Sequence, residues 1–456
     1  MRRTPRPSVV VLITIDTLRA DAVSFHGEEP GTTPFLQSLA AEGVVFTSAY
    51  APSSWTVPTM ASLFTGVAPT SHGVVRGVVV EGDRSPSDPP VHSQPVVPGS
   101  FTTLAEAFEH AGYETVGVPS NRHLADYLGF AQGFRQYFGK ADFLNADRVN
   151  PLVGDHLHRA FGPEWMKTWK KKPAFLWIHY FDPHDPFTPR EPWLSQRAPE
   201  LARSLRDSPA NLVMTDLEKR YPEPDQALAD KIRPLYYSEI SYLDEHLRRL
   251  DEALGLRGNE VLLVITADHG EEIVDHGRLG HGHSLHEELV RVPLMIRWPA
   301  AVKGGRRIGT PVSLLDVYPT LSELTGIEAP EALQGRSFAP ELVRDEKGAA
   351  RALCFELDRS GAKAAAIFEP PWKLIHQTYP ARRIQLFDLK EDPEERHDLS
   401  GAEPRIVQDL EARLMKHLNS LPPPPADFVH VRVENESLLE QLKAFGYVGE
   451  DPEEGK

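Results

Sequence analysis

A hydroxyl side chain at the expected start of a helix is the residue of this sequence best suited to nucleophilic chemistry. Thr56 is followed by Pro58 and by a run of small and apolar residues, and proline is favoured in the first turn of a helix. The unpaired backbone N–H groups and the macrodipole of such a turn favour an anion. Thr56 could therefore attack an anionic ester bound there, or it could act only as a helix N-cap, a common position for threonine.

Acidic and imidazole side chains follow three apolar runs that have the composition of buried strands. They are Asp16 after residues 8–15, Asp182 and His184 after residues 174–181, and Asp268 and His269 after residues 261–265. The carboxyl ends of parallel strands line one crevice, where ligands bind. We expect these distant segments to bring their polar ends to one place, although each alone could be an ordinary strand-end cap or turn.

A divalent cation is the natural partner of two carboxylates, an imidazole and an alkoxide oxygen, because such ligands are deprotonated and balance its charge. We predict that Asp16, Thr56, Asp268 and His269 bind one metal ion. The ion would lower the pKa of the Thr56 hydroxyl and polarise a bound ester. Among Mn²⁺, Zn²⁺, Mg²⁺ and Ca²⁺, the imidazole favours Mn²⁺ or Zn²⁺ over Ca²⁺, whose ligands are oxygens.

Charge and composition exclude several classes of partner. The chain has 456 residues and a formal net charge of −16. This acidity argues against nucleic acid or an anionic membrane surface, because both require a basic face. No apolar stretch approaches the ~20 residues of a membrane span, and the apolar run at residues 9–15 ends at Asp16 without a signal cleavage site. We therefore expect a cytoplasmic protein, and its single cysteine, Cys354, excludes an internal disulfide.

The segments that must position these residues predict an α/β fold with a mostly parallel central sheet flanked by helices. Strands are expected at residues 8–15, 113–118, 174–181 and 261–265, and helices at residues 33–42, 101–111 and 235–254. Proline, glycine, serine and aspartate mark residues 69–100 as a surface loop or flap. Residues 191–234 carry proline and charge without clear periodicity, and we expect an irregular insertion there.

A change of character near Arg351 predicts a second, smaller unit. Four short strand-like segments between residues 353 and 388 indicate an antiparallel sheet, and a polar helix at residues 404–418 would cover it. We divide the chain into a catalytic α/β domain of residues 1–350, an α+β subdomain of residues 351–425 and a tail of residues 426–456.

Residues 56–66, Thr-Val-Pro-Thr-Met-Ala-Ser-Leu-Phe-Thr-Gly, resemble the signature of the sulfatase family, a branch of the alkaline phosphatase superfamily. The resemblance implies an alkaline phosphatase-like large domain. In most sulfatases a Cys or Ser oxidised to formylglycine stands where this chain has Thr56, and an arginine where it has Met60. Thr56 cannot become formylglycine, so it acts as an alkoxide, as in the Thr-using enzymes of the superfamily, or the chemistry is lost.

The resemblance extends to the metal and substrate residues. Residues 10–21 and 268–271 are similar to the two metal-binding segments of the family, with Thr17 and His269 in place of the usual Asp and Asn. His123 and His184 resemble the family's substrate-binding histidines, and we expect nearby His283 to bind substrate as well. His281, at a position often occupied by lysine in the family, or His184 is expected to protonate the leaving oxygen. The family's lysine two places before His123 is Asn121 here. A second metal at Asp182, His184 and the histidine-rich loop would resemble the superfamily's nucleotide pyrophosphatases.

Three functions fit these residues. The chain could be a metal-dependent hydrolase of sulfate or phosphate esters, a phospho-group transferase that uses the same threonine, or a binding protein that keeps the fold without turnover. A simple alkoxide suits a phosphate-type ester, since formylglycine serves the release of sulfate. We expect a small-molecule, glycan or lipid-type ester as substrate.

Overall fold

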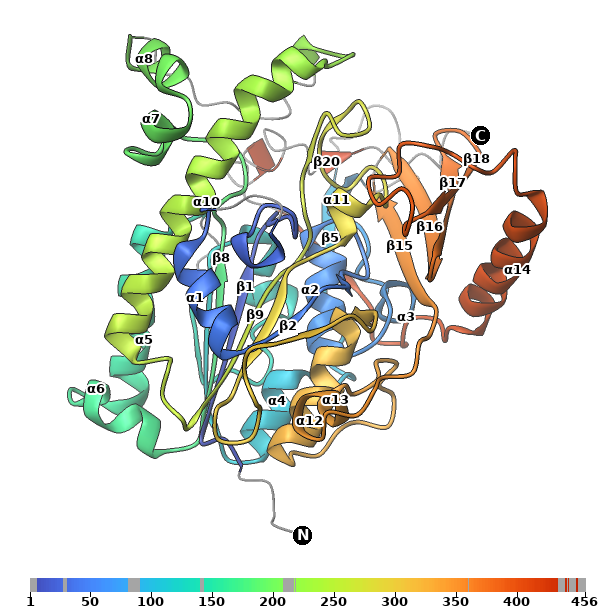
Figure 1. The fold of residues 1–456 in the computed structure, drawn as a ribbon. Helices are drawn as coiled ribbons and strands as arrows, with labels where there is room; N and C mark the ends of the chain where they lie inside the picture. The colour runs from blue at the N-terminus through green and yellow to red at the C-terminus, as the bar shows by residue number, and fades with distance from the viewer. Residues whose placement is uncertain are drawn as a thin grey trace.

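The computed structural model describes residues 6–27, 31–80, 91–139, 143–207, 217, 219–359, 361–433, 439–440, 442 and 448–449. A central sheet runs through the large part of the molecule with helices on both faces, and a smaller sheet that carries one helix lies beside it (Figure 1). This is the α/β fold predicted from the sequence.

The three central strands of the large sheet are parallel and buried along their whole length. They are β1 (Val9–Ile15), β8 (Ala174–Tyr180) and β9 (Val261–Ala267), with β1 in the middle. Ile15 pairs with Tyr180 on one side and with Ala267 on the other. The three strands therefore end at one level, and the residues that follow them meet at one edge of the sheet.

Five further strands complete this sheet in the order β13-β2-β12-β9-β1-β8-β6-β7. Pairing stays parallel through β6 and β7, whereas β12 is antiparallel to both β9 and β2. The sheet is thus mostly parallel, as predicted. The additional strands are β2 (Val44–Phe46), β6 (Glu114–Pro119), β7 (Gln136–Tyr137), β12 (Leu294–Arg297) and β13 (Arg306–Ile308).

Helices cover both faces of the sheet (Figure 1). One face carries α1 (Pro34–Glu42), α5 (Ala146–Phe161) and α10 (Gln226–Leu254), and the other carries α2 (Thr56–Thr65), α4 (Leu104–His110) and α12 (Val317–Thr325). Within the described residues, no helix has both the length and the apolarity needed to cross a bilayer. The shorter helices are α3 (Pro69–His72), α6 (Trp165–Thr168), α7 (Trp193–Arg197), α8 (Pro199–Asp207), α11 (Glu287–Val290) and α13 (Ala339–Val343).

Two parts of the helical layer differ from the sequence expectation. Helix α10 begins at Gln226 rather than at residue 235, because Asp225 caps it by accepting the N–H of Leu228 at 3.0 Å and the helix continues through Pro234. Helices α7 and α8 occupy part of the expected irregular insertion, of which residues 208–216 and 218 lie outside the described residues.

The small sheet is antiparallel, as predicted, and packs on both faces. Its strands are β15 (Leu353–Arg359), β16 (Ala362–Glu369), β17 (Trp372–Tyr379) and β18 (Arg383–Asp388), and α14 (Pro404–Ser420) covers it. Because side chains alternate along a strand, Leu374 lies in a cluster with Leu410 and Leu414 of α14, whereas Ile375 belongs to the core of the large domain.

The expected flap and the expected tail form a sheet together. Strands β4 (Val78–Val80) and β5 (His92–Pro95) pair with each other, β19 (His430–Arg432) pairs with β5, and β20 (Val448–Gly449) pairs with β4. Residues 81–90 of the expected flap lie outside the described residues. Short two-strand pairs complete the fold, namely β3 (Ala49–Tyr50) with β14 (Val312–Ser313) and β10 (Glu272–Ile273) with β11 (Leu279–Gly280).

Candidate active site

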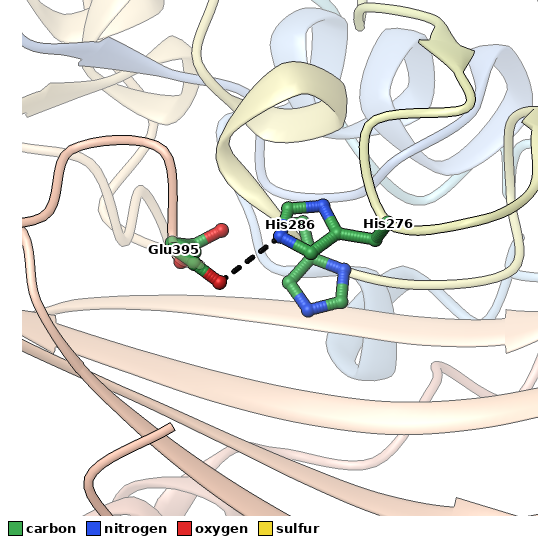
Figure 2. Close-up of side chains that lie close together, drawn as sticks. All are labelled: His276, His286 and Glu395. Atoms are coloured by element: carbon green, nitrogen blue, oxygen red, sulfur yellow. Dashed lines mark hydrogen bonds between the residues drawn. The ribbon is translucent and has the colours of Figure 1, made fainter. Parts of the chain in front are cut away.

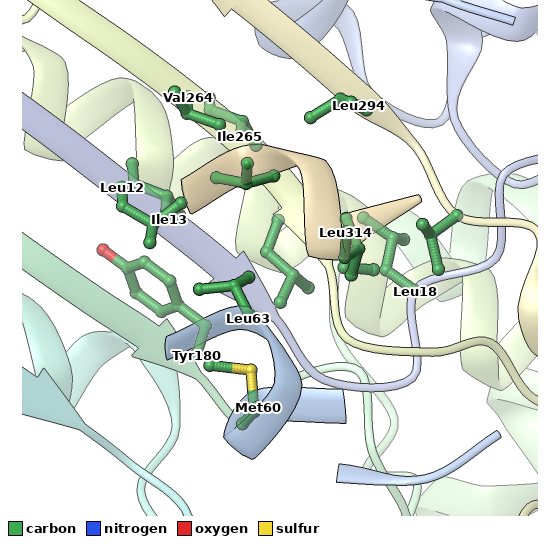
Figure 3. Close-up of a cluster of buried hydrophobic side chains, with 14 of the residues drawn as sticks. Leu12, Ile13, Leu18, Met60, Leu63, Tyr180, Val264, Ile265, Leu294 and Leu314 are labelled. Atoms are coloured by element: carbon green, nitrogen blue, oxygen red, sulfur yellow. The ribbon is translucent and has the colours of Figure 1, made fainter. Parts of the chain in front are cut away.

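Helix α2 places Thr56 at the edge of the sheet where the central strands end. The helix begins at Thr56 after an extended Trp55, and all ten of its residues are buried. Figure 3 shows Met60 of α2 in the buried cluster that includes Leu12 and Ile13 of β1. Met60 is 0% exposed, so the position occupied by arginine in most sulfatases serves core packing in this chain.

Four residues expected at a metal site lie together. Asp16, Asp268 and His269 each offer a ligand atom within 4.8 Å of the others, and all three are buried. Nε2 of His269 lies 3.5 Å from Oδ1 of Asp16 and 3.6 Å from Oδ2 of Asp268. The same nitrogen lies 3.3 Å from Oγ1 of Thr56. The hydroxyl therefore lies beside the imidazole, which in turn lies beside both carboxylates.

The donor atoms of this cluster fit a divalent cation. Oδ1 of Asp16 and Oδ2 of Asp268 are buried and have no well-formed hydrogen bond within the described part of the chain. The other oxygens are occupied: Asn121 Nδ2 donates to Oδ2 of Asp16 at 2.6 Å, and the backbone N–H of His269 donates to Oδ1 of Asp268 at 2.8 Å. Buried carboxylate oxygens need a partner, and a cation between them would supply it.

The electrostatics of the cluster also suit a cation. Burial, and next the charge of Asp16, raise the pKa of Asp268 well above its ordinary value. Burial opposes ionisation of Asp16 too, but the hydrogen bond with His179 and nearby imidazoles outweigh it and lower that pKa to about 2. Burial lowers the pKa of His269 to about 4, which keeps its ring neutral. Metal binding requires a neutral imidazole and relieves the repulsion between two carboxylates.

The expected general acid, His281, and the expected substrate-binding residue His184 lie next to this cluster. The ring of His281 is centred 4.5 Å from that of His269 and 5.0 Å from that of His184. Nδ1 of His281 lies 3.0 Å from Oε1 of Glu271, and Nδ1 of His184 lies 2.6 Å from the carbonyl oxygen of Asp185. Both rings are thereby oriented.

The other two expected substrate-binding histidines differ in placement. The ring of His123 is centred 6.3 Å from that of Trp55, the residue before Thr56, and burial lowers its pKa to about 3. His283 instead pairs with Glu272 at 2.8 Å between Nε2 and Oε2. The structure brings His123 close to Thr56 and gives His283 a partner outside the cluster.

Asp182 has partners that separate it from a second metal site. Its Oδ2 accepts the N–H of Ala146 at 2.7 Å at the start of α5, and its Oδ1 accepts from Nη2 of Arg190 at 3.2 Å. Both carboxylate oxygens of Asp182 thus accept hydrogen bonds from other parts of the protein. The sequence expectation of a second metal at Asp182 and His184 finds no support in this arrangement.

His276, His286 and Glu395 form another group with metal-ligand spacing (Figure 2). Nδ1 of His276 lies 2.9 Å from Oε1 of Glu288, and its Nε2 lies 3.2 Å from the carbonyl oxygen of Glu395. Burial opposes protonation of His276, but the bond with Glu288 outweighs it and raises the pKa to about 9. The ammonium group of Lys373 lies 2.9 Å from Glu395. An imidazolium beside an ammonium repels a metal ion, so we interpret this group as a contact between the two domains.

Three further residues of the site were not identified from the sequence. Asn121 and His179 contact Asp16, the latter at 3.4 Å between Nε2 and Oδ2. Arg359 of β15 donates from Nη1 to the carbonyl oxygen of His281 at 2.8 Å. Asn121 was visible only as a departure from a motif, whereas neither His179 inside a strand nor Arg359 in the subdomain had a sequence signal.

Family comparisons place this geometry among known enzymes. The chain matches the family model described as Sulfatase over residues 8–327, and the model described as N-sulphoglucosamine sulphohydrolase, C-terminal, over residues 276–422. It is 26% identical over 446 residues to the uncharacterized sulfatase YidJ of Escherichia coli (strain K12). The aligned region covers 86% of this chain and 83% of that protein. It is 27% identical over 458 residues to arylsulfatase A of Homo sapiens, which covers 89% and 86%, respectively.

Solved structures show the same fold. The phosphonate monoester hydrolase of Agrobacterium radiobacter has a TM-score of 0.68 at 22% identity and covers 90% of this chain and 95% of its own. BT4656, in complex with its substrate D-glucosamine-2-N,6-O-disulfate, has a TM-score of 0.68 at 19% identity, with 91% and 98% covered. Because the first family model spans well over half of the sequence, this chain belongs to the sulfatase family and is a sulfuric or phosphoric ester hydrolase.

Proposed function

We propose that this chain hydrolyses phosphate-type esters with the Thr56 hydroxyl as nucleophile, beside a divalent metal ion held by Asp16, Asp268 and His269. The observation that carries the proposal is the 3.3 Å separation between Oγ1 of Thr56 and Nε2 of His269, a nitrogen that also lies near both carboxylates. When bound, a divalent ion lowers the pKa of a neighbouring hydroxyl and polarises the ester. Mn²⁺ or Zn²⁺ suits these donors better than Ca²⁺.

The chain's own residues prepare Thr56 for attack. Backbone N–H groups at the start of α2 favour an anionic group beside Thr56, and Asn121 fixes the carboxylate of Asp16 through one oxygen. Attack forms a bond from Oγ1 of Thr56 to phosphorus and breaks the bond to the alcohol oxygen. Water then attacks the phosphothreonine, releases phosphate and restores the hydroxyl.

The histidines around Thr56 bind the substrate and supply the proton for the leaving oxygen. His281 is the proposed general acid, with Glu271 holding its Nδ1 and Nε2 as the nitrogen that delivers the proton. Burial, and next the charge of His269, lower the pKa of His281 well below its ordinary value. An anionic substrate would raise it again and favour protonation when substrate is bound. His184 is the alternative donor, and it binds substrate together with His123.

Threonine favours a phosphate-type over a sulfate-type ester. It cannot be converted to formylglycine, the group that helps a sulfatase to release sulfate, whereas a phosphothreonine can be hydrolysed by water. One of the similar structures is a phosphonate monoester hydrolase. The organic part of the substrate is proposed to be a small molecule, a glycan or a lipid-type alcohol.

The proposal is tested with the Mn²⁺-loaded protein and aryl esters of phosphate, sulfate and phosphonate, together with a phosphodiester. Thr56→Ala is expected to lower kcat by more than about 10³-fold. Thr65→Ala is the matched control, because Thr65 lies at the other end of α2 and bonds to the carbonyl of Ala61. Full activity of Thr56→Ala would reject Thr56 as nucleophile. Products that form only with an added acceptor alcohol would show that the protein is a transferase. If no ester is turned over, the protein binds its ligand without catalysis.

A further inference from the structure

A guanidinium group from the small subdomain lies at the rim of the Thr56 cluster. Arg359 is the last residue of β15. Its Nη1 donates to the carbonyl oxygen of His281 at 2.8 Å, and its Cζ lies 5.3 Å from the ring centre of Trp55. Trp55 immediately precedes Thr56, and the ring of His281 lies next to that of His269. Arg359 therefore contacts residues on two sides of the proposed reaction centre.

The backbone around Arg359 holds it in this place. The backbone N–H of Glu356, also in β15, donates to the carbonyl oxygen of Pro52 at 2.9 Å, which ties the strand to the segment leading to Thr56. Gly282 has a φ of +70°, and a Cβ atom built there would lie 2.3 Å from Nη1 of Arg359. The guanidinium thus lies in the space that a side chain at position 282 would enter.

The charge of Arg359 acts on the histidines of the site. The positive charge of Arg359 acts on the rings of His123, His269 and His281. The guanidinium therefore adds a positive potential to the volume between these rings. Such a potential attracts an anionic ligand.

We propose that the guanidinium of Arg359 binds non-bridging oxygens of the phosphate or sulfate group of the substrate, so that the small subdomain supplies part of the anion-binding site. A planar guanidinium matches two such oxygens through parallel charge-assisted hydrogen bonds. The inference rests on the proposed function for the identity of the bound group, and on the contacts of Arg359 for its position.

Anion binding without turnover tests this role. In a Thr56→Ala background loaded with Mn²⁺, isothermal titration calorimetry measures the Kd of inorganic phosphate and of inorganic sulfate. Adding Arg359→Ala is expected to weaken both about 10- to 100-fold, the loss that corresponds to charge-assisted hydrogen bonds. Arg359→Lys is expected to bind more tightly than Arg359→Ala but less tightly than arginine, because lysine keeps the positive charge and lacks the planar pair of N–H donors.

Arg382→Ala is the matched control, since Arg382 is an exposed arginine of the same subdomain that pairs with Glu411. It should leave both Kd values unchanged. Unchanged phosphate affinity in Arg359→Ala would overturn the proposal. So would a parallel loss of bound Mn²⁺ by elemental analysis, because Arg359 would then act by holding the His281 loop. If Thr56→Ala alone kept its turnover, the proposed nucleophile would fail, while the phosphate titration would still report on Arg359.

Discussion

Two buried carboxylates and one imidazole lie together at the ends of β1 and β9, and their charges determine which ligand the site can bind. Asp16 stays ionised while the pKa of Asp268 rises well above its ordinary value, with burial and the neighbouring charge of Asp16 as the causes. Oδ1 of Asp16 and Oδ2 of Asp268 have no well-formed hydrogen bond within the described residues. A cation between these oxygens would favour ionisation of both carboxyl groups. The donor atoms of the cluster therefore fit the proposed metal ion.

Asp268→Asn is expected to lower bound Mn²⁺ by roughly tenfold or more at fixed free metal, because it removes a charged ligand. Elemental analysis of the folded protein measures the change. Asp182→Asn serves as the matched control, since Asp182 ends the neighbouring strand but bonds to Ala146 and Arg190. Equal metal content in the two variants would remove Asp268 from the ligand set.

The residues of the site were predictable where a motif and a strand end coincided. Asp16 and Asp268 follow continuous apolar strands, and Thr56 precedes a helix-compatible run, so chemistry and local structure indicated the same positions. Arg359 and His179 were not predicted as site residues, because their contacts arise only from tertiary packing. Arg359 is remote in sequence from every other residue of the cluster, and no spacing rule connects it to them.

At the scale of elements, helix α2 extends from the hydrophobic core to the proposed nucleophile, Thr56. The helix buries Met60 in the hydrophobic core, and its first residue, Thr56, contacts His269, which follows β9 and lies beside Asp16 at the end of β1. Parallel pairing in register brings these strand ends to one level. The position of the hydroxyl thus depends on apolar packing a full turn away from it.

Met60→Ala is expected to reduce the free energy of unfolding by about 2–5 kcal/mol, because it leaves a cavity in a close-packed core. Urea denaturation measures it. Met166→Ala is the matched control and should change stability by less than about 0.5 kcal/mol, since Met166 is 68% exposed whereas Met60 is 0% exposed. A Met60→Ala variant as stable as the control would show that α2 is held by other contacts.

The elements themselves were predictable in proportion to their periodicity. The β-branched runs of β1 and β9 identify buried strands without ambiguity. Helix α5 was not predicted, because it contains Pro151 and begins with several residues of low helix propensity. The pairing of β19 with β5 joins segments far apart in sequence whose short strands carry no clear alternation.

At the scale of the whole molecule, residues of the two units belong to one hydrophobic core. Tyr50 of the large domain packs against Phe355 and Phe368 of the small sheet, with ring centres 5.5 and 5.2 Å apart. Buried Lys373 of the subdomain pairs with Glu287 of the large domain at 2.9 Å. This interface and the hydrogen bond to His281 hold Arg359 beside the proposed active site.

The contact of His276 with Glu288 and Glu395 should make stability depend on pH. The pKa of His276 is raised to about 9 in the folded protein, above its unfolded value of about 6.5. Its stabilising effect is therefore complete below about pH 6.5 and is lost as the pH rises through about 9, a decrease of roughly 1–3 kcal/mol. Thermal or urea unfolding between these pH values measures it.

His276→Gln should remove this part of the pH dependence, whereas His110→Gln, at an exposed position of α4, should keep it. An identical pH profile in wild type and His276→Gln would show that His276 gains no proton affinity on folding.

The central claim is that Thr56 forms a covalent intermediate beside the metal cluster. The most direct measurement is acid quenching of the Mn²⁺-loaded protein during turnover of an aryl phosphate, followed by peptide mass spectrometry. We predict one phosphoryl group on the peptide that contains Thr56, and none in Thr56→Ala. Steady turnover with an unmodified Thr56 peptide, or with the phosphoryl group on another residue, would contradict the account.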